Sequence, residues 1–333
     1  MNIFITGIAG FLGSNLAHSL IKKGYKVYGN DNLIGGYRDN LSDEFKFYEA
    51  DCCNFNAMQK ILKNMDIVIH TAATAYEGFS VFSPSFVTKN IYEASVTTFS
   101  AAISNNVKKI VFCSSMARYG EQKFPFTEDM KTLPQDPYGI AKVAAEETLV
   151  NLCNTHKIDW TILVPHNIVG PRQKYDDPFR NVLSIFLNRM INNKPAIIYG
   201  DGSQKRCFSY VDDCISCIEE AIFNKKTSEQ IINIGPDEEF ISIKELADKC
   251  ANLTGLNEKH IFYKDRPKEV KFATCSSDKA RKLLNYKTKF SLDESIQLTY
   301  EYIKKRGAKD FDYKFDIEIK NELTPETWKN KLI

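Results

Sequence analysis

The first half of the chain alternates short apolar runs with longer segments of helical periodicity, and this alternation strongly constrains the fold. Strands are expected at residues 2–7, 26–31, 45–51, 66–73, 108–115 and 159–165. Helices are expected at residues 11–24, 56–64, 85–106 and 138–156. The strands are continuous apolar runs, as is typical of strands buried on both faces. The pattern therefore predicts an α/β fold in which a doubly wound parallel sheet has helices on each side.

Three glycines, Gly7, Gly10 and Gly13, follow the first expected strand in the stretch "ITGIAGFLGSN". Glycines at this turn let the backbone approach a pyrophosphate, which then lies at the N-terminus of the next helix. Asp31 ends the second strand, 18 residues after Gly13, where a carboxylate can accept a hydrogen bond from an adenosine ribose. That carboxylate would repel a 2′-phosphate. The sequence thus predicts a Rossmann-type domain that binds NAD rather than NADP, with a purely structural glycine turn as the alternative.

After about residue 165 the regular alternation ends, and loop-rich stretches separate shorter elements. We expect an NAD-binding domain that also carries the catalytic residues at residues 1–165. A smaller substrate-binding lobe, interleaved with the sheet, is expected at residues 166–304. Residues 305–333 are polar and weakly patterned, which predicts a peripheral tail.

Composition narrows the class of partner. The net charge is only +2, so nothing favours nucleic acid or an anionic membrane surface. No apolar run approaches the ~20 residues of a membrane-spanning helix. The chain enters its first strand at once, without the pattern of a signal peptide, and its nine scattered cysteines are typical of reduced thiols. We therefore expect a cytoplasmic protein.

Two cysteines, Cys214 and Cys217, have the spacing of a redox or metal motif. They lie in a segment of helical apolar period, and no second Cys or His pair has metal-ligand spacing. We interpret both as buried helix cysteines and expect no metal site.

A tyrosine and a lysine, Tyr138 and Lys142, lie four residues apart in "DPYGIAK" and hence on one face of a helix. A tyrosine has an ordinary pKa of about 10 and needs a shift of about 3 units to act as a base near neutrality. A lysine ammonium one turn away and the nicotinamide cation of NAD both favour the phenolate. Two other Tyr–Lys pairs share this spacing, but only Tyr138 opens a helix in the nucleotide-binding half, 23 residues after Ser115.

Taken together, the glycine turn, "IHTAA", "CSSMARYG", "PYGIAK" and "YGDGSQKRCFSYVDD" resemble the extended short-chain dehydrogenase/reductases. Within them, the chain is most similar to nucleotide-sugar 4-epimerases of the UDP-glucose 4-epimerase type, over about residues 1–300. The resemblance implies that Ser115 hydrogen-bonds the sugar 4-hydroxyl, that Tyr138 is the base, and that Lys142 contacts the nicotinamide ribose. Ser114 would support the cofactor side.

The resemblance also implies the residues that bind each ligand. Besides the three glycines, Asp31, Ser114, Tyr138 and Lys142, the expected NAD-binding residues are Phe11, Leu12, Asn32, Asp51, Cys52, Thr71, Ala72, Ala73, Asn90 and Pro165. Besides Ser115 and Tyr138, the expected substrate-binding residues are Asn167, Arg206, Phe208, Arg266 and Glu269. Asn167 and the two arginines match diphosphate ligands, since an arginine fork suits phosphate oxygens. By position alone, Asp51 is equally an ordinary surface carboxylate, and each arginine a solvated charge.

Three features depart from the family pattern. His166 either touches the substrate or fills the end of a strand. Arg118 stands where a small apolar residue is usual. The aromatic-rich segment 73–84 does not match the usual epimerase sequence, which leaves the sugar open.

The leading hypothesis for the reaction is a 4-epimerisation of a nucleotide sugar, with UDP favoured over GDP, through a transient 4-keto sugar. The alternatives are a C4 dehydrogenase or 4-keto reductase, a 4,6-dehydratase, and a cofactor-binding protein without catalysis. Dehydration needs an acidic pair near the serine, whereas Met116 and Ala117 follow Ser115 here. The resemblance further implies a homodimer formed through the helices at residues 85–106 and 138–156.

Overall fold

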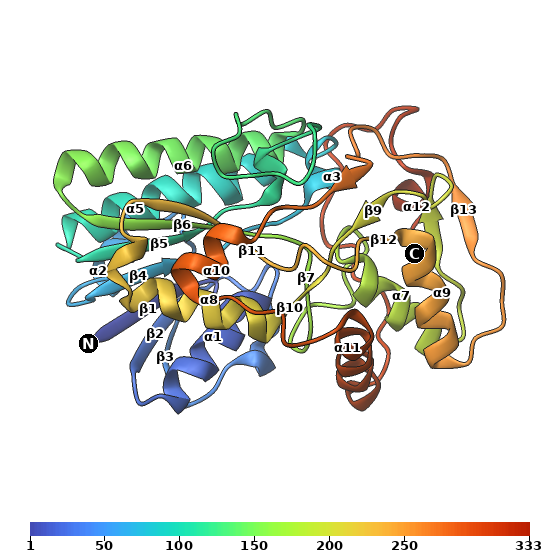
Figure 1. The fold of residues 1–333 in the computed structure, drawn as a ribbon, viewed down its shortest axis with the longest axis horizontal. Coiled ribbons are helices and arrows are strands. Elements are labelled where there is room, and N and C mark those ends of the chain that lie inside the picture. The colour runs from blue at the N-terminus through green and yellow to red at the C-terminus, as the bar shows by residue number, and fades with distance from the viewer.

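A seven-stranded parallel sheet forms one lobe of the molecule (Figure 1). The computed structural model describes residues 1–333. The strand order is β11-β6-β5-β4-β1-β2-β3, and every pairing is parallel. The strands are β1 (Asn2–Thr6), β2 (Lys26–Asp31), β3 (Lys46–Glu49), β4 (Ile67–His70), β5 (Lys109–Cys113), β6 (Asp159–Pro165) and β11 (Gln230–Ile234). The predicted doubly wound parallel sheet is confirmed.

Both faces of the sheet are apolar because successive side chains of a strand point to opposite sides. In β1, Ile3 and Ile5 enter one buried cluster and Phe4 enters the other. The first cluster contains α1 (Phe11–Lys22), α8 (Val211–Phe223) and α10 (Asp278–Leu284). The second contains α2 (Phe55–Ile61), α5 (Ala94–Ser104) and α6 (Pro137–His156), which lie on the other side of the sheet in Figure 1.

The expected helix at residues 85–106 is divided into three parts. It consists of α4 (Pro84–Thr88), a π-helical turn η2 (Lys89–Glu93) and α5. Isolated π-turns within helices are frequent at functional sites, and this one carries Asn90.

The second lobe is built from residues after β6 and lies on the right in Figure 1. Its core joins α7 (Val182–Ile191), α9 (Ile243–Thr254) and α11 (Leu292–Arg306). Its short strands pair as β7 (Ile168–Val169) with β10 (Ser209–Tyr210), β8 (Ile197–Tyr199) with β13 (Ile261–Tyr263), and β9 (Lys205–Arg206) with β12 (Ile241–Ser242) and β14 (Phe272–Ala273). The remaining short helices are η1 (Arg38–Asn40), α3 (Glu77–Ser80), η3 (Met116–Arg118), η4 (Lys225–Thr227) and α12 (Glu326–Lys329).

The two lobes are interleaved in sequence. The chain leaves the sheet after β6, builds β7 to β10 and then returns for α8 and β11, so the seventh strand of the sheet comes from beyond residue 165. That residues 1–165 bind NAD and carry the catalytic residues, and that residues 166–304 bind the substrate, remains a prediction.

The last segment, residues 307–333, is packed more closely than its polar composition predicts. Trp328 is only 3% exposed. Tyr313, Phe315 and Ile317 pack against a buried cluster that includes Tyr76 and residues of the 73–84 segment. Tyr313, Phe315 and Ile317 recur at every second residue, which is a strand-like period that places them on one face, although this segment forms no strand.

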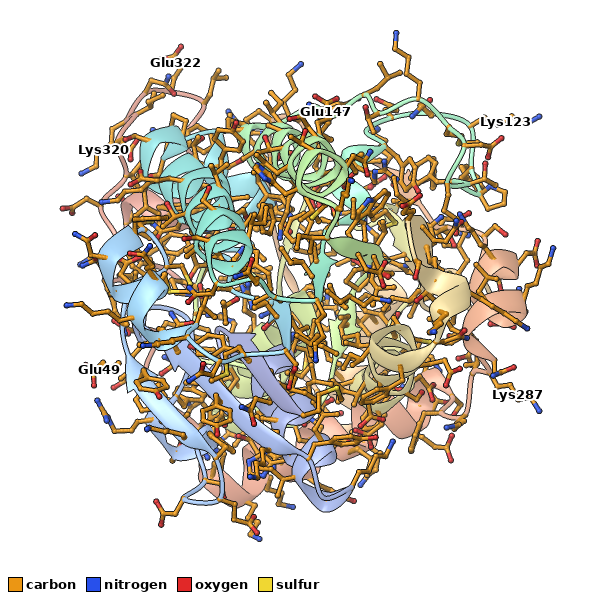
Figure 2. All side chains as sticks on the ribbon, turned by 90° about the vertical axis from the view of Figure 1, so that its left-hand side faces the viewer. Glu49, Lys123, Glu147, Lys287, Lys320 and Glu322 are labelled. Atoms are coloured by element: carbon orange, nitrogen blue, oxygen red, sulfur yellow. The ribbon has the colours of Figure 1, made fainter.

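Charged groups of both signs lie on the outer surface. Figure 2 shows Glu49, Lys123, Glu147 and Lys287 pointing away from the N-terminal lobe. All nine cysteines are free, and Cys214 and Cys217 are buried on α8, as interpreted from the sequence. None of the helices has both the length and the apolar character needed to cross a membrane.

Candidate active site

One cavity of about 450 Å³ lies where the two lobes meet, within the usual size range of small-molecule sites. It opens at the carboxyl ends of the parallel strands, where ligands bind in doubly wound folds. It is lined by residues from both lobes, among them Gly7 after β1, Ser115 after β5, and Arg206 of β9. Every NAD-binding and substrate-binding residue expected from the sequence lines this cavity. Their individual roles remain predictions.

The glycine turn is shaped for close approach of a ligand. Gly7 has φ +69°, and a Cβ there would lie 2.8 Å from the Cα of Ala72. A Cβ on Gly13 would lie 2.3 Å from the carbonyl oxygen of Gly7. Gly10 precedes α1 without any side-chain cap, so backbone N–H groups at the helix start are open to an anion in the cavity. These residues fit the pyrophosphate of a dinucleotide.

Asp31 is fixed at the end of β2. Its carboxylate accepts hydrogen bonds from the backbone N–H groups of Ala9, at 3.0 Å, and Leu33, at 2.7 Å. Burial raises its pKa, while these hydrogen bonds lower it. Asp51 accepts from the N–H of Cys53 at 2.8 Å and also lines the cavity. Both carboxylates therefore face the space into which the glycine turn opens.

Tyr138 and Ser115 form the reactive centre of the cavity. Asp136 caps α6 by accepting from the N–H of Gly139 at 2.9 Å, which sets Tyr138 in the first helical turn. Tyr138 is 6% exposed, and the Ser115 hydroxyl lies near its phenol. Burial raises the pKa of Tyr138, and the nearby Ser115 hydroxyl lowers it.

Lys142 lies one helical turn after Tyr138. Its ammonium donates to the carbonyl oxygen of Cys113 at 2.8 Å and lies 4.8 Å from the centre of the Phe112 ring. Burial lowers its pKa to about 8, whereas Glu146 raises it. The sequence analysis expected Lys142 to favour the Tyr138 phenolate, but among the protein's own groups burial has the largest effect and raises the pKa of that phenol.

Arg118, which the sequence analysis could not explain, belongs to a buried ion pair. Its guanidinium lies 2.9 Å from the carboxylate of Glu146, with both side chains about 5% exposed or less. Glu146 also accepts from the hydroxyl of Ser114. Arg118 therefore packs behind the strand that ends in the two serines. Glu146 was not predicted from the sequence, although it follows Lys142 by four residues on the same helix face.

His166 also has a structural role. Its Nε2 lies 2.9 Å from the carbonyl oxygen of Pro236, and its side chain is buried outside the cavity lining. Of the two alternatives left open by the sequence, the structure supports the filling of the strand end.

The substrate side holds a cluster of charged and amide groups. Arg206 donates to the backbone carbonyls of Lys205, Lys271 and Val270, so part of its hydrogen-bonding capacity is already used. Arg266 pairs with Glu269 at 2.9 Å and lies over the ring of Tyr199, 4.7 Å from its centre.

The amide groups of the cavity are oriented by the backbone around them. Asn167 donates to the carbonyl oxygen of Cys207 at 2.9 Å, which leaves its own side-chain oxygen free. Asn90 donates to the carbonyl oxygen of Phe86 at 2.8 Å.

Several cavity residues were not found by sequence reasoning: Thr74, Glu77, Arg180, Asn181 and Tyr199. Thr74 and Asn181 each have a buried polar atom without a partner in the protein, which is the condition of a group that binds a ligand or water. The only signal for Glu77 was that segment 73–84 departs from the family pattern. No cluster of three His, Cys, Asp or Glu side chains is arranged to hold a metal ion.

The fold and the cavity define a class: a Rossmann-type protein with a dinucleotide cradle beside a Ser–Tyr–Lys group. A family model described as "NAD dependent epimerase/dehydratase family" matches residues 3–235. The chain therefore belongs to this family and is an NAD-dependent enzyme of the extended short-chain dehydrogenase/reductases.

Named relatives extend over nearly the whole chain. The UDP-glucose 4-epimerase of Mycolicibacterium smegmatis is 31% identical over 92% of this chain and 100% of its own length. The UDP-glucuronate 4-epimerase of Thermodesulfobacterium geofontis is 30% identical over 90% of this chain and 95% of its own.

Solved structures show the same fold. The UDP-glucose 4-epimerase of Thermotoga maritima, solved with UDP-glucose, has a TM-score of 0.87 and 32% identity, covering 92% of this chain and 99% of its own. The UDP-glucuronic acid 4-epimerase of Bacillus cereus, solved with UDP-glucuronic acid and NAD, has a TM-score of 0.85 and 30% identity, covering 92% and 100%. These neighbours act on both a neutral sugar and a sugar acid, so similarity leaves the sugar undecided.

Proposed function

We propose that this protein is an NAD-dependent nucleotide-sugar 4-epimerase, with a UDP-hexose as the favoured class of substrate. The observation that carries the proposal is the single cavity in which the glycine turn, the Ser115–Tyr138–Lys142 group and Arg206 with Arg266 meet. A nucleotide sugar laid across it would have its diphosphate at the arginines and its sugar at Tyr138. Relatives and structural neighbours named as UDP-sugar 4-epimerases support this proposal.

The roles of the chain's own residues follow from their positions. Tyr138 accepts the proton of the sugar 4-hydroxyl at its phenol oxygen, while Ser115 holds that hydroxyl by a hydrogen bond. When bound beside Tyr138 and Lys142, NAD would supply a reversible acceptor for the hydride at C4. The cavity holds the 4-keto sugar while it turns to present its other face. Tyr138 then returns the proton to the 4-oxygen, so no additional acid is consumed.

A test is conversion of UDP-glucose and UDP-galactose in D₂O, followed by NMR. Interconversion without deuterium in the sugar is expected, because the hydride returns from the bound cofactor. A 4-keto-6-deoxy product with solvent deuterium would instead indicate a dehydratase, for which Glu77 would be the additional carboxyl group near Tyr138. Accumulation of NADH, measured by absorbance at about 340 nm, with a stable 4-keto product would indicate a dehydrogenase.

The variant Tyr138→Phe removes the proton acceptor and should reduce turnover by about 10²–10⁴-fold. Full activity of this variant would contradict the assignment of the base. Its fold should be retained, since Phe fills nearly the same volume, and a thermal melting curve serves as the check.

We also propose a cytoplasmic homodimer. Tyr92 on η2 and Ile140 on α6 are large apolar side chains that are 37% and 55% exposed. The two elements lie against each other on the outer side of the sheet, so both side chains belong to one candidate interface. Light scattering on the purified protein, compared with Ile140→Lys, would test this.

A further inference from the structure

Glu77 presents an unpaired carboxylate to the cavity. It is the first residue of α3 and lines the cavity together with Gly78 and Val81. Neighbouring charges act on its carboxylate, but it makes no salt bridge or side-chain hydrogen bond with another residue. A carboxylate placed in a cavity without a protein partner is available to a ligand.

Helix α6 holds α3 at the reactive end of the cavity. The hydroxyl of Ser80 donates to the carbonyl oxygen of Glu77 at 2.6 Å and accepts from the N–H of Tyr138 at 3.2 Å. α3 also packs directly on α6. Glu77 therefore lies near the sugar end, where Tyr138 would act, and not near the adenine end at Asp31.

The C-terminal segment holds the same region from the opposite side. Ile319 donates its N–H to the carbonyl oxygen of Phe82 at 2.8 Å. The carboxylate of Glu318 accepts from the N–H groups of Ser85, at 2.9 Å, and Phe86, at 2.7 Å, at the start of α4. The ring of Trp328 packs against Gly78, next to Glu77. Segment 77–86 is thus held between α6 and the tail.

The charges around Glu77 favour a sugar without its own negative charge. Arg206 and Arg266 are the cationic groups that act on Glu77, and both are the proposed diphosphate ligands. Arg180, the other cation near Tyr138, lies over the ring of Tyr76, 5.6 Å from its centre, and its charge lowers the pKa of the buried Asp177 carboxyl against the effect of burial. With the diphosphate bound to Arg206 and Arg266, Glu77 adds a negative charge beside the sugar that no salt bridge within the protein neutralises.

We propose that Glu77 makes this enzyme select nucleotide sugars without a carboxylate, such as hexoses and amino sugars, over nucleotide uronates. A sugar hydroxyl or ammonium can donate to Glu77, whereas the charge of Glu77 would repel a uronate carboxylate at short range. The inference rests on the proposed function and names the substrate class of the same site.

Binding measurements test the inference independently of turnover. Calorimetry on the NAD-loaded protein should show UDP-glucose binding about tenfold or more tightly than UDP-glucuronate. Glu77→Gln keeps the size of the side chain and removes its charge, so it should abolish most of this difference by strengthening UDP-glucuronate binding. The matched control is Glu322→Gln, the same change at an exposed residue that points away from the molecule in Figure 2.

The pH dependence gives a second readout. Burial and the neighbouring Asp136 raise the pKa of Glu77 to about 7, while Arg206 and Arg266 oppose this shift; Glu269 and Tyr138 also face Glu77. Glu77 gains its charge as the pH rises through that value. Binding of UDP-glucuronate should therefore weaken between about pH 6 and about pH 8 in the parent, and much less in Glu77→Gln.

Equal affinities for the two sugars in the parent, or an unchanged affinity ratio in Glu77→Gln, would overturn the inference. Failure to convert any UDP-sugar would overturn the proposed function instead. The affinity ratio would still decide whether Glu77 discriminates against uronates, so the two failures are distinguishable.

Discussion

At the scale of single residues, the least expected feature is the buried ion pair of Arg118 and Glu146. Burying two charges costs on the order of several kcal/mol, which good geometry and additional hydrogen bonds must offset. Glu146 meets this condition by contacting Arg118 and Ser114 together. Because Ser114 precedes Ser115, the pair also helps to fix the end of β5 at the site.

Removing one partner of this pair should be more harmful than removing both. Arg118→Met and Glu146→Gln should each lower the free energy of unfolding by about 3–5 kcal/mol, because each leaves a buried charge without its partner. The double variant should recover a large part of that loss. Urea denaturation of the four proteins measures this, and a double variant as unstable as the sum of the single changes would contradict the expectation.

The sequence could predict a site residue where the expected reaction requires one type of side chain at one spacing. Ser115, Tyr138 and Lys142 follow from their spacing and from the resemblance, and they share one cavity. Glu77 and Glu146 were missed, because a glutamate in a loop or on a helix is most often a surface residue. Only their spatial neighbours distinguish them from ordinary glutamates.

At the scale of elements, the C-terminal tail is joined to α3 and α4. The tail lies more than 200 residues further along the chain, yet Ile319 in the tail donates a backbone hydrogen bond to Phe82 between the two helices. Trp328 packs its ring against Phe79, Phe82 and Phe179, with ring centres 5.5 to 6.0 Å apart. Sequence composition gave no warning of this packing, since polar residues such as Lys320 and Glu322 dominate the tail.

The variant Trp328→Ala tests the tail. It removes the side chain that packs against Gly78, where Arg266 also approaches, and should lower the free energy of unfolding by about 3–5 kcal/mol. The KM for the nucleotide sugar should rise more than kcat falls, while NAD affinity changes little. Steady-state kinetics with Lys320→Ala as the control measures this. An unchanged KM in a destabilised Trp328→Ala protein would show that the tail supports the fold only.

At the scale of the whole molecule, the cavity exists because the chain crosses between the lobes several times. The sheet supplies the glycine turn and the Ser–Tyr–Lys group, and the second lobe supplies Arg206 and Arg266. Neither lobe forms the lining by itself, so ligands that bind across it should stabilise the whole fold.

NAD⁺ should raise the thermal stability of the entire protein more than NADP⁺ does. A ligand at about 100 times its dissociation constant adds about 2.7 kcal/mol to the free energy of unfolding. Asp31 faces the cavity and would repel a 2′-phosphate, so NADP⁺ at the same concentration should produce a smaller shift. Calorimetric melting curves with each dinucleotide measure the difference, and equal shifts would argue against the role given to Asp31.

The sequence by itself determined the features that depend on neighbours along the chain. Apolar runs gave the buried strands, periodicity gave the helices that cover them, and the glycine spacing gave the cradle at the start of α1. These signals are local, because strand and helix geometry repeats every two or about 3.6 residues.

Tertiary structure alone decided which distant residues meet. It packed Trp328 against Gly78 of the cavity lining, paired Arg118 with Glu146, and buried His166 outside the cavity. The physical reason is that burial and charge compensation depend on atoms close in space, whereas the pattern in the chain records only what is close in sequence.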